Sequence, residues 1–263
     1  MNWLVQNNLI KETLIEDMES ACKALGHHFI GLKIIPFTDS VEFGFPPGFE
    51  MPKGKLIPYG STSMIKMIGR SNLDKSGFFF NQENLRTSKW VEKLGKRMLN
   101  HDAQVMSLKD AMDLKEGFYF MKPDNDLKDF SGCLVNAGGI KKFYDQVSAG
   151  GFTFSTDIQV VLSEPKDTGW EWRFFMIGDR IISCSSYKLR DMLNQTKAVG
   201  HNVKDFAVET ARTWHPDEVY VMDICEADEG LKVVEFNCFN ASGFYACDVR
   251  EVVEQVSKFV SLK

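Results

Sequence analysis

The sequence lacks the short motifs that mark several large enzyme classes. It contains no Walker A loop, no Gly-x-Gly-x-x-Gly fingerprint, no His-Glu-x-x-His pair and no Gly-x-Ser-x-Gly turn. These motifs hold phosphates, bind zinc or present a serine nucleophile. We therefore expect none of the reactions that depend on them. A covalent intermediate on a side chain is not expected either, since no Ser or Cys stands in a convincing dyad.

The cysteines also lack a metal-binding pattern. No two of the six stand in Cys-x-x-Cys spacing or beside a His pair, so zinc is not expected. A chain of 263 residues with 44% hydrophobic residues needs no disulfides for stability, and reduced thiols are expected. No run of about eighteen apolar residues could span a membrane, and Met1–Ile10 lacks the basic lead of a signal peptide. We expect a cytoplasmic protein without a membrane partner.

Positive charge is scarce for a protein that would bind a nucleic-acid duplex. Lys and Arg number 31 and Asp and Glu number 36, which gives a formal net charge of −5. Neutralising duplex phosphates needs a broad basic face, so nucleic acid is not an expected partner, although a local basic site stays open. At roughly 150 residues per domain, the length allows one large domain or two to three small lobes.

Apolar patterns predict α/β structure in three α+β lobes. Residues 1–80 alternate strand and helix, as in a βαβ unit. Residues 81–165 begin with a helix over Asn81–Asn100, and residues 166–263 contain two hairpins, Trp172–Tyr187 and Val219–Asn237. The other expected strands are Trp3–Gln6, Phe29–Ile35, Lys55–Tyr59, Phe118–Met121 and a strand-rich stretch over Phe152–Leu162. The other expected helices are Leu14–Leu25, Met64–Ile68, Ile140–Val147, Val203–Trp214 and Asp248–Leu262.

The second hairpin predicts a site for a divalent cation. If residues 228–230 form its loop, Asp223 lies opposite Glu235. The flanking residues are apolar on both faces, so the two carboxylates are expected to be buried, which is costly unless their charge is compensated. Asn237 returns to the same face as a third oxygen ligand, and this set suits Mg²⁺. The alternative is that each carboxylate is paired with a Lys or an Arg.

Polar side chains also alternate along the first hairpin. With a turn at residues 178–179, Arg173 is predicted opposite Cys184, and Glu171 opposite Ser186. The rest of the hairpin is rich in Phe, Met and Ile, so a polar face indicates that the hairpin lines a cleft. The alternative is a solvated outer face on which Glu171 pairs with Arg173.

These hairpins resemble the ATP-grasp superfamily. Its carboxylate–amine ligases end their ATP-binding lobe with an Asp on one strand and Glu-x-Asn on the next, as in Val-Tyr-Val-Met-Asp223 and Glu235-Phe-Asn237. The resemblance covers nearly the whole chain. It implies an ATP-grasp fold with a pre-ATP-grasp lobe over 1–80, a central lobe over 81–165 and a C-terminal lobe over 166–263, with ATP bound between the last two.

The resemblance also implies a nucleotide site. Phe-Met-Lys122-Pro resembles the strand-borne lysine that reaches the α- and β-phosphates, although a lysine at a strand end also commonly extends to water. Glu164 and Glu171 resemble the residues that meet adenine and ribose. Lys128 lies in the segment that resembles the flap over the phosphates. That segment has only Gly132 where many members are glycine-rich, so Lys128 is expected to supply direct charge instead.

The implied reaction is a ligation driven by ATP, with ATP and Mg²⁺ as cofactors. A carboxylate is phosphorylated and an amine attacks the acyl phosphate, so the expected partners are small-molecule or peptide carboxylates and amines. The cations expected to stabilise the transferred phosphoryl group are Arg173, Lys188 and Arg190. Two alternatives stay open: ATP-dependent phosphoryl transfer on the same fold, and a nucleotide-binding interaction module without turnover.

Overall fold

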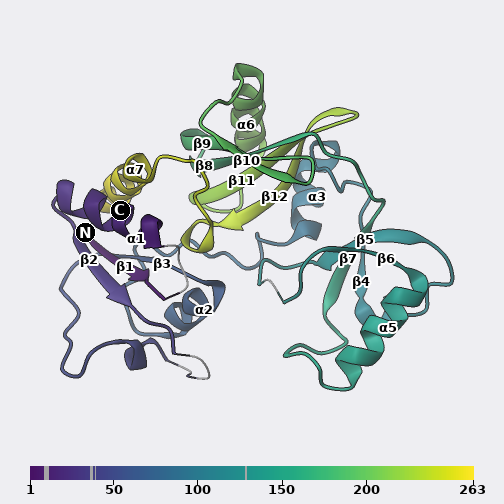
Figure 1. The fold of residues 1–263 in the computed structure, drawn as a ribbon, viewed down its shortest axis with the longest axis horizontal. Coiled ribbons are helices and arrows are strands. Elements are labelled where there is room, and N and C mark those ends of the chain that lie inside the picture. The colour runs from purple at the N-terminus through teal and green to yellow at the C-terminus, as the bar shows by residue number, and fades with distance from the viewer. Residues whose placement is uncertain (9–11, 36–37, 39, 128) are drawn as a thin grey trace.

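The computed structural model describes residues 1–8, 12–35, 38, 40–127 and 129–263, which form three sheets with helices packed on them (Figure 1). The strand orders are β2-β1-β3, β4-β7-β5-β6 and β10-β9-β8-β11-β12. The first sheet is parallel and the other two are antiparallel. This arrangement confirms the predicted α/β class with separate α+β lobes.

The N-terminal sheet forms the βαβ unit that the sequence predicts. Its elements are β1 (Asn2–Gln6), α1 (Glu12–Ala24), β2 (His28–Leu32), a 3-10 turn (Val41–Gly44), β3 (Leu56–Tyr59) and α2 (Thr62–Arg70). Both faces of β1 are buried. Trp3 and Val5 share a core with α1, whereas Leu4 shares one with α2. A strand covered on both faces needs a continuous apolar run, which explains its sequence.

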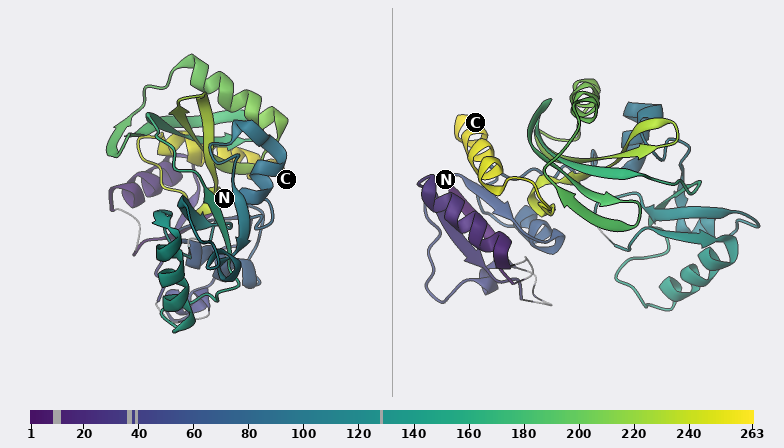
Figure 2. Two further views of the ribbon diagram at one scale, coloured as in Figure 1. Left: turned by 90° about the vertical axis from the view of Figure 1, so that its right-hand side faces the viewer. Right: turned by 45° about the horizontal axis from the view of Figure 1, so that its top comes forward.

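The last helix returns to this N-terminal sheet. Helix α7 (Val249–Leu262) lies beside α1, and both chain ends lie on the same side of the molecule (Figure 2). The indole Nε1 of Trp3 donates to Ser257 Oγ at 3.0 Å. The side chain of Asp248 accepts from the N–H of Glu251 and caps the helix. The first and last segments of the chain therefore share one core.

The central lobe packs two helices on one face of its sheet. Its elements are β4 (Gln104–Ser107), α4 (Leu108–Ala111), β5 (Phe118–Pro123), β6 (Cys133–Asn136), α5 (Ala137–Ser148) and β7 (Gln159–Ser163). The expectation of strand-rich structure over Phe152–Leu162 is wrong for its first half. There Phe152 and Phe154 pack against Phe143 of α5 instead of entering a ladder.

The C-terminal sheet carries α3 and α6 in one apolar cluster. Its strands are β8 (Trp170–Ile177), β9 (Arg180–Leu189), β10 (Met192–Thr196), β11 (Val219–Ala227) and β12 (Gly230–Cys238). The helical segments are α3 (Thr87–Leu94), a 3-10 turn (Gly95–Arg97), α6 (His201–Thr213) and a 3-10 turn (Phe239–Ala241). Trp90 of α3 lies 5.6 Å from Phe236 of β12, centroid to centroid. Helix α3, which the sequence places in the central lobe, thus packs on the C-terminal sheet, and the lobe boundaries near residues 80 and 165 stay predictions.

The second hairpin has the predicted pairing of Asp223 with Glu235, but its turn differs. Ala227 pairs with Gly230, so the loop is the two residues 228–229 and not three. The register then shifts between Asp223 and Ile224, where β12 holds one extra residue, Val234. A bulge of this kind bends the strand and re-aims its side chains. The extra residue lies inside the strand instead of in the loop, and the carboxylates still face each other.

The first hairpin has the predicted turn but contains two register shifts. Ile177 pairs with Arg180 across residues 178–179. Shifts on either side of the central pairs place Arg173 opposite Ser185 and Glu171 opposite Lys188. The predicted partners Cys184 and Ser186 are therefore wrong, because each bulge moves the pairing by one residue.

The thiols and helices fit the broader expectations. All six cysteines are free. Burial raises the pKa of the Cys22 and Cys225 thiols to about 12, so they stay protonated near neutral pH. Within the part of the chain that is described, no helix is long and apolar enough to cross a membrane.

Candidate active site

A cavity of about 660 Å³ lies between the central and C-terminal sheets. This inter-sheet cavity is lined by residues of β5 and β6, by the 164–168 linker between β7 and β8, and by β12. Its size falls in the range of about 300–1,000 Å³ that is typical of small-molecule sites. Six residues singled out from the sequence line it: Lys122, Glu164, Glu171, Lys188, Arg190 and Glu235.

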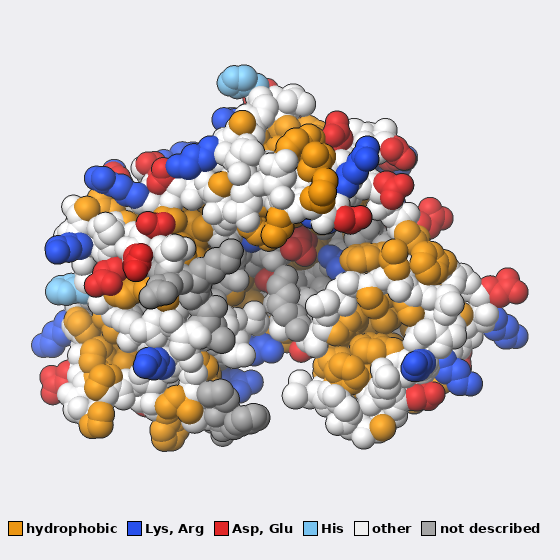
Figure 3. Space-filling model, viewed as in Figure 1, with side chains coloured by type: hydrophobic (Ala, Val, Ile, Leu, Met, Phe, Trp, Pro, Cys, Tyr) orange, Lys and Arg blue, Asp and Glu red, His pale blue; other side chains and the backbone are white. Residues whose placement is uncertain are grey.

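Apolar surface continues outward from this cavity over the central lobe. Hydrophobic side chains gather on that lobe, at the right of Figure 3. Phe118, Leu134 and Phe152 are among its exposed large hydrophobic residues. Leu134 also lines the inter-sheet cavity together with Phe120. The cavity therefore combines an apolar wall from the central sheet with charged side chains from both sheets.

Lys122 lies near the end of β5, opposite Val161 of β7. Its Nζ lies 5.1 Å from the centroid of the Trp90 ring, within reach of a cation–π contact. Lys122 and Glu235 also line a smaller neighbouring cavity of about 240 Å³. This position supports contact with an anion that enters between the sheets. The other predicted phosphate-binding lysine, Lys128, lies outside the described residues, and its role stays a prediction.

The linker after β7 is braced by Asp102. The N–H of Glu164 donates to Asp102 Oδ2 at 2.9 Å, and Lys166 forms an ion pair with the same carboxylate. Burial acts to raise the pKa of Asp102, but the bonds from Lys166 and from the backbone outweigh it and hold the pKa below its usual value. The backbone at Glu164 is thereby fixed at the cavity wall, while its side chain is exposed.

We expect Asp102→Asn to loosen this linker. Losing an ion pair worth up to about 1 kcal/mol should lower the hydrogen-exchange protection of the Glu164 amide about two- to fivefold. A lowered folded-state pKa stabilises the brace above the ordinary aspartate pKa of about 3.9, and that contribution is lost as pH falls through the folded value. Protection in the native protein should therefore drop in acid. Asp113→Asn, at an exposed site of the same lobe, is the control. Equal protection in both variants would contradict the brace.

Glu171 is held at the cavity wall by three side chains. Its Oε1 accepts from Lys188 Nζ at 2.9 Å and from Thr168 Oγ1 at 3.0 Å, and its Oε2 accepts from Tyr187 Oη at 2.5 Å. Burial, followed by the charges of Asp223 and Glu171, raises the pKa of Tyr187, so the phenol stays a donor. Glu171 thus pairs with Lys188, and the predicted alternative of a pair with Arg173 is wrong.

Arg190 lies at the turn between β9 and β10, at the exposed edge of the inter-sheet cavity. Its φ is 52°, a left-handed conformation that is uncommon for a residue other than glycine. Its N–H donates to the carbonyl of Gly169 at 2.8 Å, which ties the turn to the start of β8. Arg190 and Lys188 therefore bring two cations to the same wall.

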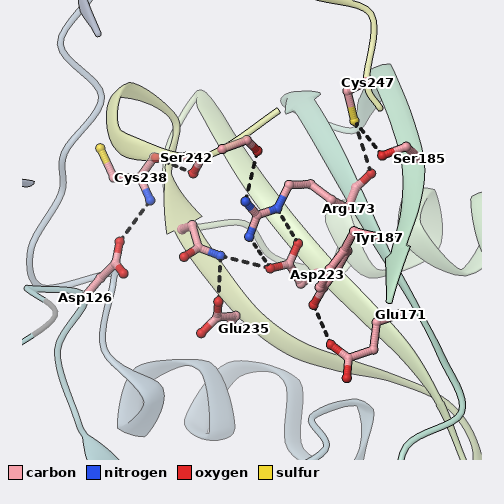
Figure 4. A network of polar contacts seen from close by, with 12 residues as sticks. Asp126, Glu171, Arg173, Ser185, Tyr187, Asp223, Glu235, Cys238, Ser242 and Cys247 are labelled. Atoms are coloured by element: carbon pink, nitrogen blue, oxygen red, sulfur yellow. Dashed lines mark hydrogen bonds and ion pairs between the residues drawn. The ribbon is translucent and has the colours of Figure 1, made fainter. Parts of the chain in front are cut away.

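Figure 4 shows that the three predicted metal ligands lie together. Asn237 Nδ2 lies 3.2 Å from Asp223 Oδ2 and 3.1 Å from Glu235 Oε1. The side chain of Asp223 is 1% exposed, whereas Glu235 is half-buried and lines two cavities. Two carboxylates and one amide thus meet where β11 and β12 face the central sheet.

Arg173 forms a bidentate ion pair with Asp223. Its Nε donates to Oδ1 at 2.8 Å and its Nη2 to Oδ2 at 2.6 Å, and its Nη1 donates to the carbonyl of Gly243 at 3.0 Å. Burial acts to lower the pKa of Arg173, but the charge of Asp223 outweighs it and the guanidinium stays charged. The predicted alternative of a carboxylate paired with an Arg thus occurs at Asp223. Arg173 lies behind this carboxylate and not in the wall of the inter-sheet cavity.

The residues present fit a Mg²⁺ ion by the type and number of their donors. Among residues that the structure describes, no group of three or more His, Cys, Asp and Glu could hold a metal. Asp223, Glu235 and Asn237 instead offer two carboxylates and one amide oxygen, the small oxygen set that Mg²⁺ uses when phosphates and water complete its shell. Because Arg173 offsets the charge of Asp223, the remaining negative charge of the set belongs to Glu235.

Sequence reasoning missed two tyrosines of the site. Tyr187 and Tyr245 stack at 4.6 Å between centroids, and the Arg173 guanidinium lies 4.7 Å from the Tyr245 ring centroid. An unbroken register puts Tyr187 on the face away from Glu171, and only the shift between Glu171 and Trp172 brings them together. The adjacent Lys188 was the available signal, since the strand end was already identified as polar.

Solved structures with a similar fold cover nearly the whole chain. The RimK domain ATP-grasp protein of Sphaerobacter thermophilus is 10% identical, with a TM-score of 0.60 over 97% of this chain and 99% of that one. D-alanyl-alanine synthetase A of Vibrio cholerae is 13% identical, with a TM-score of 0.61 over 99% and 98%. The macrocyclase MdnC of Microcystis aeruginosa, bound with precursor peptide MdnA, is 11% identical, with a TM-score of 0.54 over 98% and 100%. At these identities the likeness shows the fold alone.

The family follows from the sequence itself. None of the curated proteins matches the chain. The sequence model of a family described as an ATP-grasp domain, the third family of its clade, matches residues 59–256, well over half of the chain. This match confirms the resemblance found in the two hairpins and agrees with the three-sheet fold. The chain therefore belongs to this third family within its clade of ATP-grasp domains.

Proposed function

We propose that this protein is an ATP- and Mg²⁺-dependent ligase that joins a carboxylate to an amine through an acyl phosphate. The observation that carries the proposal is the inter-sheet cavity, where residues from both sheets and from the linker between them converge. Its apolar wall, Phe120 and Leu134, suits a planar base, and its cations suit phosphates. The family membership supports the same use of the cavity.

The cations of the cavity would bind and orient the phosphates. Lys122 approaches from the central sheet, and Lys188 and Arg190 approach from the C-terminal sheet. Lys188 is held by Glu171, which fixes its position at the cost of part of its charge. Positioned cations stabilise the charge that spreads over a transferring phosphoryl group. Glu164, on the braced linker, would meet the nucleoside at the other end of the cavity.

Asp223, Glu235 and Asn237 would hold the metal. Mg²⁺ would supply charge that neutralises the phosphate oxygens during transfer. Arg173 keeps Asp223 in one orientation through two bonds, and three of its five N–H donors are engaged. Its two remaining N–H groups could face an oxyanion that develops next to Gly243. The role of these residues is thus mainly positioning and electrostatic stabilisation.

The reaction balances without a nucleophile from the protein. The substrate carboxylate takes the γ-phosphoryl group from ATP and releases ADP. The amine then forms a bond to the acyl carbon as the carbon–oxygen bond to phosphate breaks, and it loses a proton. The substrates would be amino acids or peptides, a class favoured by the D-alanyl-alanine synthetase and by the macrocyclase bound to a peptide.

Release of ADP and phosphate, measured with pools of amino acids and short peptides, tests the proposal. We expect ADP release that requires Mg²⁺, a carboxylate and an amine together. ADP release with a stable phosphorylated product would instead identify a phosphotransferase. Tight binding of ATP without release under any condition would identify a nucleotide-binding module, and either result would refute the ligase.

A further inference from the structure

A second cavity, of about 480 Å³, lies between the N-terminal lobe and the segment that follows β12. Its wall, which we call the N-terminal cavity wall, includes Asp17 of α1, the start of α2 and residues 241–245. None of the predicted nucleotide or metal ligands lines it. Arg173 donates to the carbonyl of Gly243 in this wall and to Asp223 behind it, so its guanidinium separates the cavity from the predicted metal set.

Several hydrogen-bond donors of the N-terminal cavity wall are already used within the protein. The hydroxyl of Tyr59 donates to the carbonyl of Ser242, and Ser242 Oγ donates to the carbonyl of Cys238 at 2.7 Å. The backbone N–H groups that are engaged in the same way are those of Gly60, Ser61 and Ser242. A carboxylate entering this cavity would have to compete with these internal acceptors, which costs the bonds that they make.

The charge of the wall points in the same direction. Asp17 is the one charged side chain among the described residues that line the cavity, and it is exposed. A carboxylate only accepts hydrogen bonds, so it pairs with a ligand that donates them. The inter-sheet cavity differs, because its wall holds several Lys and Arg residues. The N-terminal cavity thus favours a cation with several N–H donors, and Leu14, Phe244 and Val249 add an apolar surface for its carbon chain.

We propose that the N-terminal cavity binds the amine substrate as a primary ammonium ion without an adjacent free carboxylate, with Asp17 as its counter-ion. The ligand's role as a substrate rests on the proposed function, whereas its binding does not. A free amino acid would bring a carboxylate that finds few free donors in this wall. An amine, an amino-acid amide or the amino end of a peptide would not carry that penalty.

Binding without nucleotide tests this site directly. Three probes of matched carbon skeleton are leucinamide, leucine and 4-methylpentanoate, measured by calorimetry and by ligand-detected NMR on the full chain. We expect leucinamide to bind most tightly, leucine at least about fivefold more weakly, and 4-methylpentanoate most weakly. Asp17→Asn should weaken leucinamide about three- to tenfold, the effect of losing one partly solvated charge contact. Asp17→Lys should reverse the order and favour 4-methylpentanoate.

The control is Glu16→Gln, an exposed neighbour on the same helix that does not line the cavity. It should leave all three affinities unchanged. Leucinamide binding no tighter than 4-methylpentanoate, or leucinamide binding that is equal in Asp17→Asn and the native chain, would overturn the proposal. If leucinamide binds through Asp17 but no ATP turnover occurs, the site stands and the ligase function fails. If ATP turnover requires an amine that does not depend on Asp17, the ligase stands and this cavity assignment fails.

Discussion

Arg173→Met is expected to lower the free energy of unfolding by about 3–5 kcal/mol, because it leaves a buried carboxylate without its guanidinium. Arg173 makes two hydrogen bonds to Asp223, whose side chain is 1% exposed. A buried charge that loses its partner keeps its desolvation penalty and loses the attraction that offset it. Since domains of this kind are stabilised by about 5–15 kcal/mol in total, the variant should be marginally stable. Urea unfolding followed by circular dichroism measures the change.

Two further variants separate the ion pair from other effects of the substitution. In Arg173→Met with Asp223→Asn the buried charge is removed as well, so we expect the double variant to regain about 1–3 kcal/mol relative to Arg173→Met alone. The matched control is Arg212→Met, which breaks an exposed pair with Asp179, and it should cost less than about 1 kcal/mol. Similar losses in Arg173→Met and Arg212→Met would show that the buried pair contributes nothing special.

The same pair shows how far the sequence predicts the site. The motif identifies Asp223, Glu235 and Asn237, and their contacts follow from the strand pairing. The partner of Asp223 is harder to predict, because Arg173 lies directly opposite it on β8, in a pairing between strands that are far apart in the sequence. Hairpin arithmetic relates only strands joined by a turn. It therefore places Arg173 relative to β9 and says nothing of β11.

The bulges limit register prediction in a physical way. Alternation of apolar and polar residues reports which face a side chain occupies only while the ladder is regular. On β12 the flanking residues are apolar on both faces, so one extra residue, Val234, leaves no trace in the pattern. On β9 the shift near Glu171 moves Lys188 opposite it, and its long side chain makes the bond. Polar clusters were thus easier to predict than exact pairs.

Packing partners of helices were the other limit. The period of apolar residues predicts that residues 87–94 form a helix with one apolar face, but not which sheet that face covers. In the structure Trp90 and Leu94 join the core of the C-terminal sheet, next to Phe236. Trp90 also lies against Lys122 of the central sheet. Helix α3 therefore bridges two sheets that the sequence assigned to separate lobes.

Glu235→Gln is expected to reduce Mg²⁺-dependent ATP turnover at least about 100-fold while leaving the fold intact. Glu235 carries the remaining negative charge of the predicted metal set, because Arg173 offsets that of Asp223, and it lines both cavities at the end of β12. Gln keeps the size and one oxygen but removes that charge, so Mg²⁺ and the phosphates it binds should be held less tightly. Because Glu235 is half-buried, the loss of stability should stay below about 1 kcal/mol.

The effect on the metal can be separated from the effect on the fold. Asp223→Asn should also abolish turnover, but it frees Arg173 from its partner and is expected to lower stability as well. Glu235→Gln is therefore the sharper variant, and Asp228→Asn, in the turn of the same hairpin, is its control. Calorimetry with a non-hydrolysable ATP analogue should show that Mg²⁺ strengthens binding to the native chain and to Asp228→Asn, but far less to Glu235→Gln. Removing Mg²⁺ with a chelator should lower binding by the native chain to the level of the variant. Unchanged turnover in both Glu235→Gln and Asp223→Asn would refute the metal assignment, because no other part of the proposal needs two carboxylates at this place.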